Sequence, residues 1–476
     1  MGKYLKKFET TAEYESFIAS DYDKPNVSLC EDNNEVHYNP IEPPLPNNII
    51  RYEASAKLAE TSSNKSAGLH TNAFNTTIKS HTFENGVGTI EFNDDVTTIA
   101  GGGGGSPNYG AFGGCSNMTN ISIPNSVTSI TSIAFVGCTS LPVVDNIRYA
   151  DTYAIGAVDK TLTEYTIKNG TKWIGDYAFQ YCSGLTSVTI PSSVTSIGYG
   201  AFSYCSSLTS VTIPDSVTSI GNSAFYGCSG LTSVTIPSSV TTIGNSAFSS
   251  CSGLTSVTIP SSVTTIGDYA FSYCSGLTSV TIGSGVTSIG RYAFSACGLT
   301  SIVIPDNVTS MGGEVFRGCS DLTSVTIGSG ITSINTSNFW NCYSITNITI
   351  DSNNTVYDSR NNCNAIIETA TNTLIMGSNS TIIPNSVTSI GYGAFQDCSD
   401  LTSVTIPSSV TSIGGFPFIG SGRPSVITVE STTPPTMTSL WETSGNSTIY
   451  VPAESVETYK TTSGWSTYAS IIQAIP

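Results

Sequence analysis

The sequence is poor in charge, and in positive charge above all. Only 11% of the 476 residues are charged, and 34 Asp and Glu against 17 Lys and Arg leave a formal net charge of −17. A basic surface that neutralises the phosphates of a nucleic acid is therefore not expected. The exposed residues must be largely Ser, Thr, Asn and Gly, which predicts a neutral surface rich in hydroxyl groups.

Long apolar runs are also missing. No stretch reaches the roughly 18 apolar residues that span a bilayer, so insertion into a membrane is not expected. Residues 1–20 lack the apolar core of a secretory signal peptide. Lys6 stands where N-myristoylation needs Ser or Thr, so no lipid anchor is expected there.

Residues that carry metal or acid–base chemistry are scarce. The sequence has no C-x-x-C pair, and its histidines are His37, His70 and His81. A zinc site is therefore not expected, and neither is any other metal or cofactor. The three histidines precede most of the repeats described below, and acidic residues are scattered over different repeat positions, as at Asp215, Asp268 and Asp306. The glycine run 101–105 lacks the G-K-[ST] of a phosphate loop. We expect no enzymatic activity.

The most abundant feature of the sequence is one 23-residue repeat. Residues 231–253 read LTSVTIPSSVTTIGNSAFSSCSG, and residues 208–230 and 254–276 have almost the same sequence. The β-branched L-x-x-V-x-I opening predicts a strand, which the following proline ends. V-T-S-I then predicts a second short strand, and A-F-x-x-C predicts one helical or 3₁₀ turn that places Phe in the core. Each copy has apolar residues at the same eight positions, here Leu231, Val234, Ile236, Val240, Ile243, Ala247, Phe248 and Cys251.

One such coil cannot bury its apolar face alone, so copies must stack. Eleven coils end in a matching cysteine and a twelfth, 401–420, ends in FPFIG; the cysteines are Cys115, Cys138, Cys182, Cys205, Cys228, Cys251, Cys274, Cys297, Cys319, Cys342 and Cys398. Two longer gaps, after Cys138 and after Cys342, contain paired alternating runs that predict β-hairpin coils continuing the stack. The expected fold is mainly β: a solenoid of leucine-rich-repeat type with a 23-residue period, about 11–12 coils plus hairpin insertions.

The ends differ from the middle, as the caps of a solenoid must. We expect an N-terminal anchor module with a proline-rich linker at 1–48, a cap with the first coil at 49–100, the solenoid at 101–420 and a C-terminal cap at 421–476. Within the anchor module, 10–18 predicts a short helix and 27–39 a hairpin turning at Asn33-Asn34. The C-terminal cap should cover the last coil with Val456, Tyr459, Trp465, Tyr468, Ile471 and Ile472.

Cysteines in a column raise the possibility of disulfides, because equivalent residues on adjacent coils would lie near 5 Å apart, by the rule for strand spacing. Eleven is an odd number, however, and free thiols that pack as small hydrophobic groups fit better. Cys30 and Cys363 lie outside the column, and the sequence pairs neither of them.

From about residue 79 to 476 the chain resembles the BspA-type leucine-rich repeat proteins, in the repeated L-T-S-V-T-I-P-x-S-V-T-S-I-G-x-x-A-F-x-x-C and the closing V-P-A-E-S-V-E-x-Y-K. This resemblance implies an extracellular adhesion or host-recognition solenoid, common among gut Bacteroidetes and some mucosal parasites, without catalytic residues. The opening KYLKKFETTAEYESFI resembles leaders on structural proteins of phages of gut Bacteroidetes.

The two resemblances together favour a phage virion fibre or decoration protein. Its N-terminus would bind capsid or tail proteins, and its solenoid would bind a host surface glycan or protein. A homotrimer is expected by analogy with other phage fibres. The alternative is a bacterial cell-surface adhesin. The candidate anchor residues are Tyr4, Phe8, Tyr14, Phe17, Val36 and Tyr38.

Two rows of side chains are candidates for the recognition surface. A hydroxyl ladder on the strands could bind glycans, or its members could be ordinary exposed strand residues; it comprises Thr189, Thr212, Thr235, Thr258 and Thr281. Tyrosines around the A-F-x-x-C segment suit sugar stacking or protein recognition, or they could pack over the Phe column; they are Tyr177, Tyr181, Tyr199, Tyr204, Tyr269, Tyr273 and Tyr292.

Overall fold

The computed structural model describes residues 4–7, 27–32, 35–40, 45–61, 69–100, 110–131, 134–421, 424–438 and 447–476, the first three ranges by their backbone only. The described chain divides into two compact units, Met1–Ser140 and Leu141–Pro476. The glycine run 101–105 and the helix expected at 10–18 lie outside the described residues.

Unit 1 begins with a three-stranded antiparallel sheet, ordered β1(Tyr4–Lys7)-β3(Glu35–Pro40)-β2(Val27–Asp32). The hairpin expected at 27–39 is confirmed, because β2 and β3 pair up to Asp32 and Glu35. A second sheet has the order β10(Met118–Ser122)-β4(Ile49–Ala54)-β8(Val87–Phe92)-β7(Ile78–Glu84). Strand β10 opens the coil that ends at Cys138, and β4 pairs with its edge antiparallel. The antiparallel strands thus cover an edge that would otherwise be open to association.

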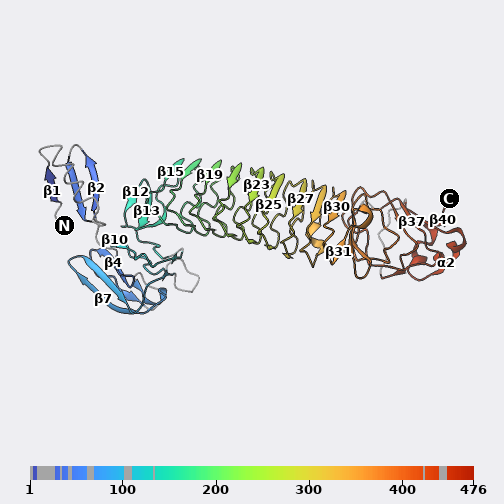
Figure 1. Ribbon diagram of the computed structural model, residues 1–476, viewed down its shortest axis with the longest axis horizontal. Helices are drawn as coiled ribbons and strands as arrows, with labels where there is room; N and C mark the ends of the chain where they lie inside the picture. Colours follow the sequence, from blue (N-terminus) through green and yellow to red (C-terminus); the bar gives the residue numbers. More distant parts are fainter. Residues whose placement is uncertain are drawn as a thin grey trace. The chain divides into compact units, whose positions relative to one another are not determined.

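Unit 2 is a parallel β-solenoid, and with the coils of unit 1 the chain makes about 14 turns of a roughly 23-residue period. Figure 1 shows the strands β15, β19, β23 and β27 following one another along this unit. In most coils the S-V-T-I strand alternates exposed and buried residues, as Ser256–Ile259 does, because Val and Ile face the core while Ser and Thr face solvent. The mainly β fold predicted from the sequence is confirmed.

Two series of parallel strands run through the repeats. The longer strands are β15(Glu164–Thr166), β17(Ser187–Thr189), β19(Ser210–Thr212), β21(Ser233–Thr235), β23(Ser256–Ile259), β25(Ser279–Ile282), β27(Ser301–Ile304), β29(Ser324–Ile327) and β30(Asn347–Ile350). The shorter strands are β16(Trp173–Ile174), β18(Ser196–Ile197), β20(Ser219–Ile220), β22(Thr242–Ile243), β24(Thr265–Ile266), β26(Ser288–Ile289) and β28(Ser310–Met311). Equivalent residues of adjacent coils pair, as Ile197 does with Ile220. Residues at the same position of the repeat therefore lie side by side in the sheet.

The two expected hairpin insertions are confirmed. In the first, β13(Ile147–Ala150) pairs antiparallel with β14(Tyr153–Ala157), and β14 then pairs parallel with β16. In the second, β32(Ile366–Glu368) pairs antiparallel with β33(Thr373–Met376), and β33 pairs parallel with β34(Ser389–Ile390). The second strand of each hairpin therefore continues the parallel sheet into the next regular coil.

The expectation that A-F-x-x-C forms a helical or 3₁₀ turn is wrong for most coils. A 3₁₀ helix forms in only one described copy, η2(Thr336–Phe339). Elsewhere the segment is a chain of turns in which residues with positive φ flank the Ala-Phe pair, such as Gly200 with φ 57° and Tyr204 with φ 60°. A left-handed residue ends a helix, so no helical run can continue through the segment.

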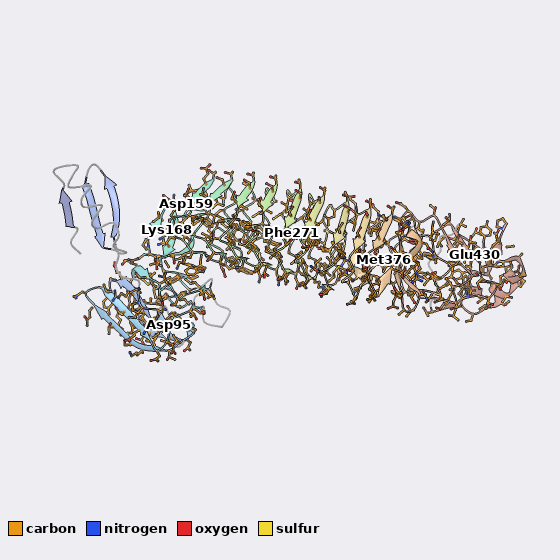
Figure 2. The ribbon with its side chains drawn as sticks, in the orientation of Figure 1. Asp95, Asp159, Lys168, Phe271, Met376 and Glu430 are labelled. Carbon is orange, nitrogen blue, oxygen red and sulfur yellow. The ribbon has the colours of Figure 1, made fainter. Side chains whose placement is uncertain are left out.

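The core is built from columns of identical side chains. From Phe179 to Phe339, successive phenylalanine rings stack with centroids 5.0–5.8 Å apart, and Phe271 in Figure 2 lies within this column.

The expectation that the column cysteines pack as buried thiols is confirmed. From Cys205 to Cys342 each thiol donates a hydrogen bond to the carbonyl of the phenylalanine 25 or 26 residues earlier, at 3.1–3.2 Å.

The C-terminal cap closes the stack as predicted. The last regular strands are β35(Ser403–Ile406), β36(Ser412–Ile413), β37(Val426–Val429), β38(Thr436–Met437), β39(Thr448–Val451) and β40(Ile472–Ala474). The helices α2(Val456–Thr461) and η5(Trp465–Ile471) bring Tyr459, Trp465 and Tyr468 into the core, and Val456 and Ile471 pack against it. Trp465 Nε1 and Tyr459 Oη donate to the carbonyls of Pro435 and Ser431, so both rings are buried without an unpaired polar atom.

Candidate recognition surface

The loop segment around A-F-x-x-C holds two positions whose backbone is left-handed. The first loop position directly precedes the Ala (Val in one coil); φ there is 55–61° at Tyr177, Gly200, Ser223, Ser246, Tyr269, Tyr292 and Glu314. The second loop position directly precedes the Cys; φ there is 53–77° at Tyr181, Tyr204, Gly227, Ser250, Tyr273, Ala296, Gly318 and Asn341. Such values cost an ordinary residue about 1–2 kcal/mol. The residues keep these φ values because hydrogen bonds to the adjacent coil impose them.

The coils dictate these angles through a ladder of backbone hydrogen bonds. Within one segment the N–H groups of Tyr177, Phe179 and Tyr181 donate to the carbonyls of Tyr199, Ala201 and Ser203 in the next coil, at 2.7–2.9 Å. The next segment repeats the pattern, with Phe202 donating to Ala224 at 2.7 Å. The left-handed residues turn these N–H groups toward the following coil. Side chains at both loop positions are thereby fixed in a regular row.

The structure places most of the predicted tyrosines in the open. Tyr177, Tyr181, Tyr199, Tyr204, Tyr269 and Tyr273 are 39–63% exposed, whereas Tyr292 is partly buried. The interpretation that they pack over the phenylalanine column therefore fails for the first six. Tyr392, which holds the same place relative to Ala-Phe as Tyr199, is 65% exposed.

Most of these rings are paired with a ring of the neighbouring coil. Tyr181 stacks on Tyr204 with centroids 5.0 Å apart, and Tyr204 meets Tyr226 edge-on at 5.2 Å. Tyr177 meets Tyr199 edge-on at 5.1 Å. Part of the surface of each ring is therefore covered by its neighbour. Tyr273 differs, because its neighbours at the second loop position are the small residues Ser250 and Ala296.

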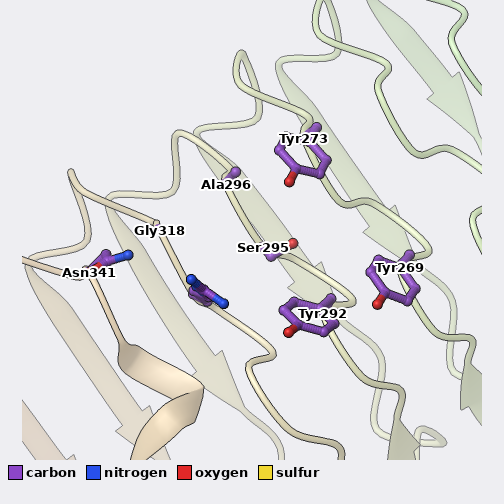
Figure 3. Close-up of a pocket in the computed structure, with 8 residues that line it drawn as sticks. Tyr269, Tyr273, Tyr292, Ser295, Ala296, Gly318 and Asn341 are labelled. Atoms are coloured by element: carbon purple, nitrogen blue, oxygen red, sulfur yellow. The ribbon is translucent and has the colours of Figure 1, made fainter.

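A pocket of about 470 Å³ opens beside this ring, and Figure 3 shows its residues on successive coils. It is lined by Tyr269, Tyr273, Tyr292, Ser295, Ala296, Arg317, Gly318 and Asn341. Tyr269 stacks on Tyr292 with centroids 4.9 Å apart, which forms one wall. The hydroxyls of the three tyrosines point the same way in Figure 3. The volume lies in the range of small-molecule sites, about 300–1,000 Å³.

Arg317 is a pocket residue that the sequence interpretation missed. It follows Phe316 at a position held by serine in the preceding two coils, at Ser272 and Ser295. Its Nη1 lies 2.5 Å from Glu314 Oε2, and Arg291 Nη2 lies 3.3 Å from the other oxygen of the same carboxylate. Hydrogen bonds from Tyr292 and then from the two arginines lower the pKa of the Glu314 carboxyl, which stays ionised. Comparing one repeat column down the sequence would have revealed Arg317.

The predicted threonine ladder is a separate row. Thr189, Thr212, Thr235, Thr258 and Thr281 are all exposed on the longer strands, and pairs such as Thr258 and Thr281 are in register. A row of hydroxyls is present as predicted, but it is flat, since the strand residues beside it are Ser and Thr.

The candidate anchor residues are only partly described. Tyr4 lies in β1, and Val36 and Tyr38 lie in β3, where Tyr4 pairs with Tyr38 and Lys6 with Val36 in the antiparallel register. Phe8, Tyr14 and Phe17 lie outside the described residues. The structure therefore brings Tyr4, Val36 and Tyr38 into one sheet.

The acidic residues considered for catalysis turn out to be structural where contacts are resolved. Asp268 Oδ1 accepts a hydrogen bond from the backbone N–H of Arg291 at 2.7 Å, and Asp306 Oδ1 accepts one from Ser329 at 2.9 Å. Over the described ranges, no group of three His, Cys, Asp or Glu side chains is placed to hold a metal. In the same ranges no helix is both long and apolar enough to cross a membrane.

One of the similar solved structures superposes well enough to support the fold. A leucine-rich repeat protein from Bacteroides ovatus is 25% identical, covers 88% of this chain and 99% of its own, and superposes with a TM-score of 0.52. A protein from Eubacterium ventriosum is 24% identical over 47% of this chain and 66% of its own, with a TM-score of 0.38. A leucine-rich cell surface protein from Faecalibacterium prausnitzii is 26% identical over 70% and 90%, with a TM-score of 0.39. No curated protein matches significantly.

Comparison with family models is more specific. The model described as "BspA type Leucine rich repeat region (6 copies)" matches residues 61–154, 157–274, 241–367 and 376–462. These ranges cover well over half of the chain and include the loop segments described above. The chain therefore belongs to the family of BspA-type leucine-rich repeat proteins.

Proposed function

We propose that this chain is a non-enzymatic recognition protein of a bacterial cell surface, and that the row of tyrosines on its loop segments contacts a host glycan or protein. The observation that carries the proposal is the exposure of six tyrosines on backbone that adjacent coils hold rigid. Tyrosine offers a large contact area and a hydroxyl group at a low entropic cost. The BspA-type family, with its implied role in adhesion, supports the same function.

The tyrosines of the loop segment can be removed for the test without changing the backbone conformation. Glycine with positive φ occupies the first loop position at Gly200 and Gly393 and the second at Gly114, Gly137, Gly227 and Gly318. A Tyr→Gly change at these positions therefore keeps a backbone that the fold already uses. We would combine Tyr181→Gly, Tyr204→Gly, Tyr269→Gly and Tyr273→Gly in one variant. The matched control replaces Thr189, Thr212, Thr235 and Thr258 of the strand ladder by valine.

Binding of the full chain to immobilised intestinal mucin and to epithelial cells is the readout. We expect the tyrosine variant to lose at least about tenfold in affinity, as loss of several central aromatic contacts does, and the threonine control to stay within about twofold. The reverse pattern would move the recognition surface to the threonine ladder. Equal binding by both variants and the parent chain would refute recognition through either row.

A virion protein remains the second candidate. It is favoured by the leader, whose strands β1, β2 and β3 form a sheet of their own. Under this proposal the leader binds phage capsid or tail proteins, and the chain is a homotrimer. Antibody against the solenoid separates the two candidates: labelling of intact bacteria supports the cell surface, whereas labelling of purified phage particles, abolished by deletion of residues 1–44, supports the virion.

A further inference from the structure

The pocket beside Tyr273 is where the repeat departs from its own pattern. We propose that it binds a saccharide residue that carries an anionic group, either a carboxylate or a sulfate. This inference rests on the proposed function, because it names the ligand class of one site on the tyrosine row.

The aromatic part of the argument is the open ring of Tyr273. The ring is 63% exposed, and its column neighbours Ser250 and Ala296 carry no ring to cover it. The face of an aromatic ring is the negative pole of its quadrupole, and it attracts the weakly positive C–H groups of a sugar ring. The stacked rings of Tyr181 and Tyr204 offer such a face less fully. Of the tyrosines that line the pocket, Tyr273 is thus the one best suited to stack on a sugar.

The charge of the pocket comes from Arg317, the charged residue in its lining. Its side chain is 44% exposed and shares the Glu314 carboxylate with Arg291, so one carboxylate serves two guanidinium groups. The nearby carboxylates of Asp268 and Asp397 lie outside the lining, and each accepts a backbone hydrogen bond. A guanidinium has five N–H donors, and a planar fork of them matches a carboxylate or sulfate.

Neutral groups complete the site for a sugar. Tyr343 Oη donates to Asn341 Oδ1 at 3.1 Å, which fixes the amide and points to Nδ2 as the donor for a ligand. Ser295 also lines the pocket, and its hydroxyl lies 2.7 Å from that of the buried Ser272, which holds it in place. Hydroxyl and amide groups around an aromatic face match the alternating hydroxyl and C–H surface of a sugar.

The position of these residues in the repeat array strengthens the argument. Where Arg317 stands, the other described coils carry uncharged residues, most often serine, as at Ser203, Ser249, Ser272 and Ser295; asparagine occurs at the second loop position only at Asn341 among these coils. Both departures fall in adjacent coils and both line one pocket. Because the other coils stack without a charged residue at this position, the packing of the solenoid does not require Arg317.

The experiment is calorimetric titration of the full chain with three matched probes: lactose, 3′-sialyllactose and lactose 6-O-sulfate. We expect at least one anionic probe to bind about tenfold or more tightly than lactose. Arg317→Gln should remove that preference and leave the affinity for lactose unchanged. Tyr273→Gly should weaken all three probes, and comparison of the two anionic probes distinguishes a carboxylate from a sulfate.

Arg291→Gln is the matched control, because Arg291 pairs with the same Glu314 but lies outside the lining. An equal loss in Arg291→Gln and Arg317→Gln would mean general attraction and would overturn the site. Equal affinity for the three probes, or binding of none of them, would also overturn it. If the four-tyrosine variant still loses mucin binding in that case, the proposed function stands without this ligand. If mucin binding is unchanged in that variant, the proposed function fails and the titration alone decides the site.

Discussion

Single residues in this chain are shaped by their place in the column more than by their own preference. Tyr177, Tyr269 and Tyr273 adopt φ values near 60°, a conformation that bulky side chains rarely take. Three inter-coil hydrogen bonds per loop segment outweigh the cost at each tyrosine. The strain is therefore a property of the segment and should be relieved wherever glycine replaces a left-handed residue that makes few side-chain contacts.

Ser246 is such a residue, with φ 55° at the first loop position. We expect Ser246→Gly to raise the free energy of unfolding by about 0.5 kcal/mol, because about 1 kcal/mol of left-handed strain is relieved against about 0.5 kcal/mol of added unfolded-state entropy. The measurement is the urea midpoint followed by tryptophan fluorescence. Ser252→Gly, at an exposed residue without positive φ, is the control and should be destabilising. Destabilisation in both variants would show that the loop positions carry no strain.

The residue scale also shows why the candidate site was only half predictable. The tyrosines could be found because aromatic residues recur beside A-F and C, and the structure exposes six of the seven. Arg317 and Asn341 were missed because each residue type occurs once at its position in the repeat, and a single difference from the repeat consensus does not form a pattern. The left-handed backbone gave no sequence signal until Gly, Ser and Tyr were seen to share one position.

At the scale of elements, the hairpin insertion interrupts the loop ladder. The coils ending at Cys342 and Cys398 are separated by β32 and β33, so the N–H of Asn341 has no loop carbonyl in the next coil to receive it. The Oδ2 of Asp397 accepts this hydrogen bond instead, at 2.7 Å, and Asp397 is buried. Asp397 stands at the second loop position itself, with φ 61°. One carboxylate thus bridges the ladder across the insertion.

Asp397→Ala should therefore destabilise unit 2 by about 1–3 kcal/mol, because it leaves the partly buried N–H of Asn341 without its acceptor. Asp397→Asn, which keeps an oxygen, should lose less. The control is Asp400→Ala at an exposed residue, where a change within about 0.5 kcal/mol is expected. Urea midpoints of the four proteins decide the matter. If Asp397→Ala and Asp400→Ala unfold at the same midpoint, the bridge contributes nothing.

The elements also show what the repeat period can and cannot predict. The two strand series, the hairpins and the C-terminal cap followed from where apolar residues recur, because burial is a property of the pattern. The loop segment did not follow, since A-F-x-x-C has the spacing of a helical turn and only the hydrogen bonds to the next coil prevent it. Local spacing cannot report a partner that lies one coil away.

At the scale of the whole molecule, the two units carry different spectroscopic and titratable groups. All four tryptophans lie in unit 2, and all three histidines lie in unit 1. His81 is buried between Tyr52 Oη, 2.7 Å from Nε2, and Glu60 Oε1, 2.8 Å from Nδ1. Burial lowers the pKa of His81, and the hydrogen bond to Glu60 only partly opposes this. In unit 2 the pKa values of the carboxyls Asp159, Glu314 and Asp358 are shifted downward and those of the buried cysteines upward, so these groups do not titrate between pH 7.5 and 5.0.

Acid should therefore destabilise unit 1 before unit 2. Because the pKa of His81 is lower in the folded chain than the unfolded value of about 6.5, the unfolded chain takes up the proton first as the pH falls. The stabilisation is complete above about pH 6.5 and is lost progressively below it. From pH 7.5 to 5.0 we expect the calorimetric transition of unit 1 to fall by about 4 °C and the tryptophan-detected transition of unit 2 to stay in place. His81→Gln isolates the cause, since the difference in shift between parent and variant belongs to His81 alone. An identical shift in both proteins, or a parallel fall of the tryptophan transition, would remove His81 as the origin of the pH dependence.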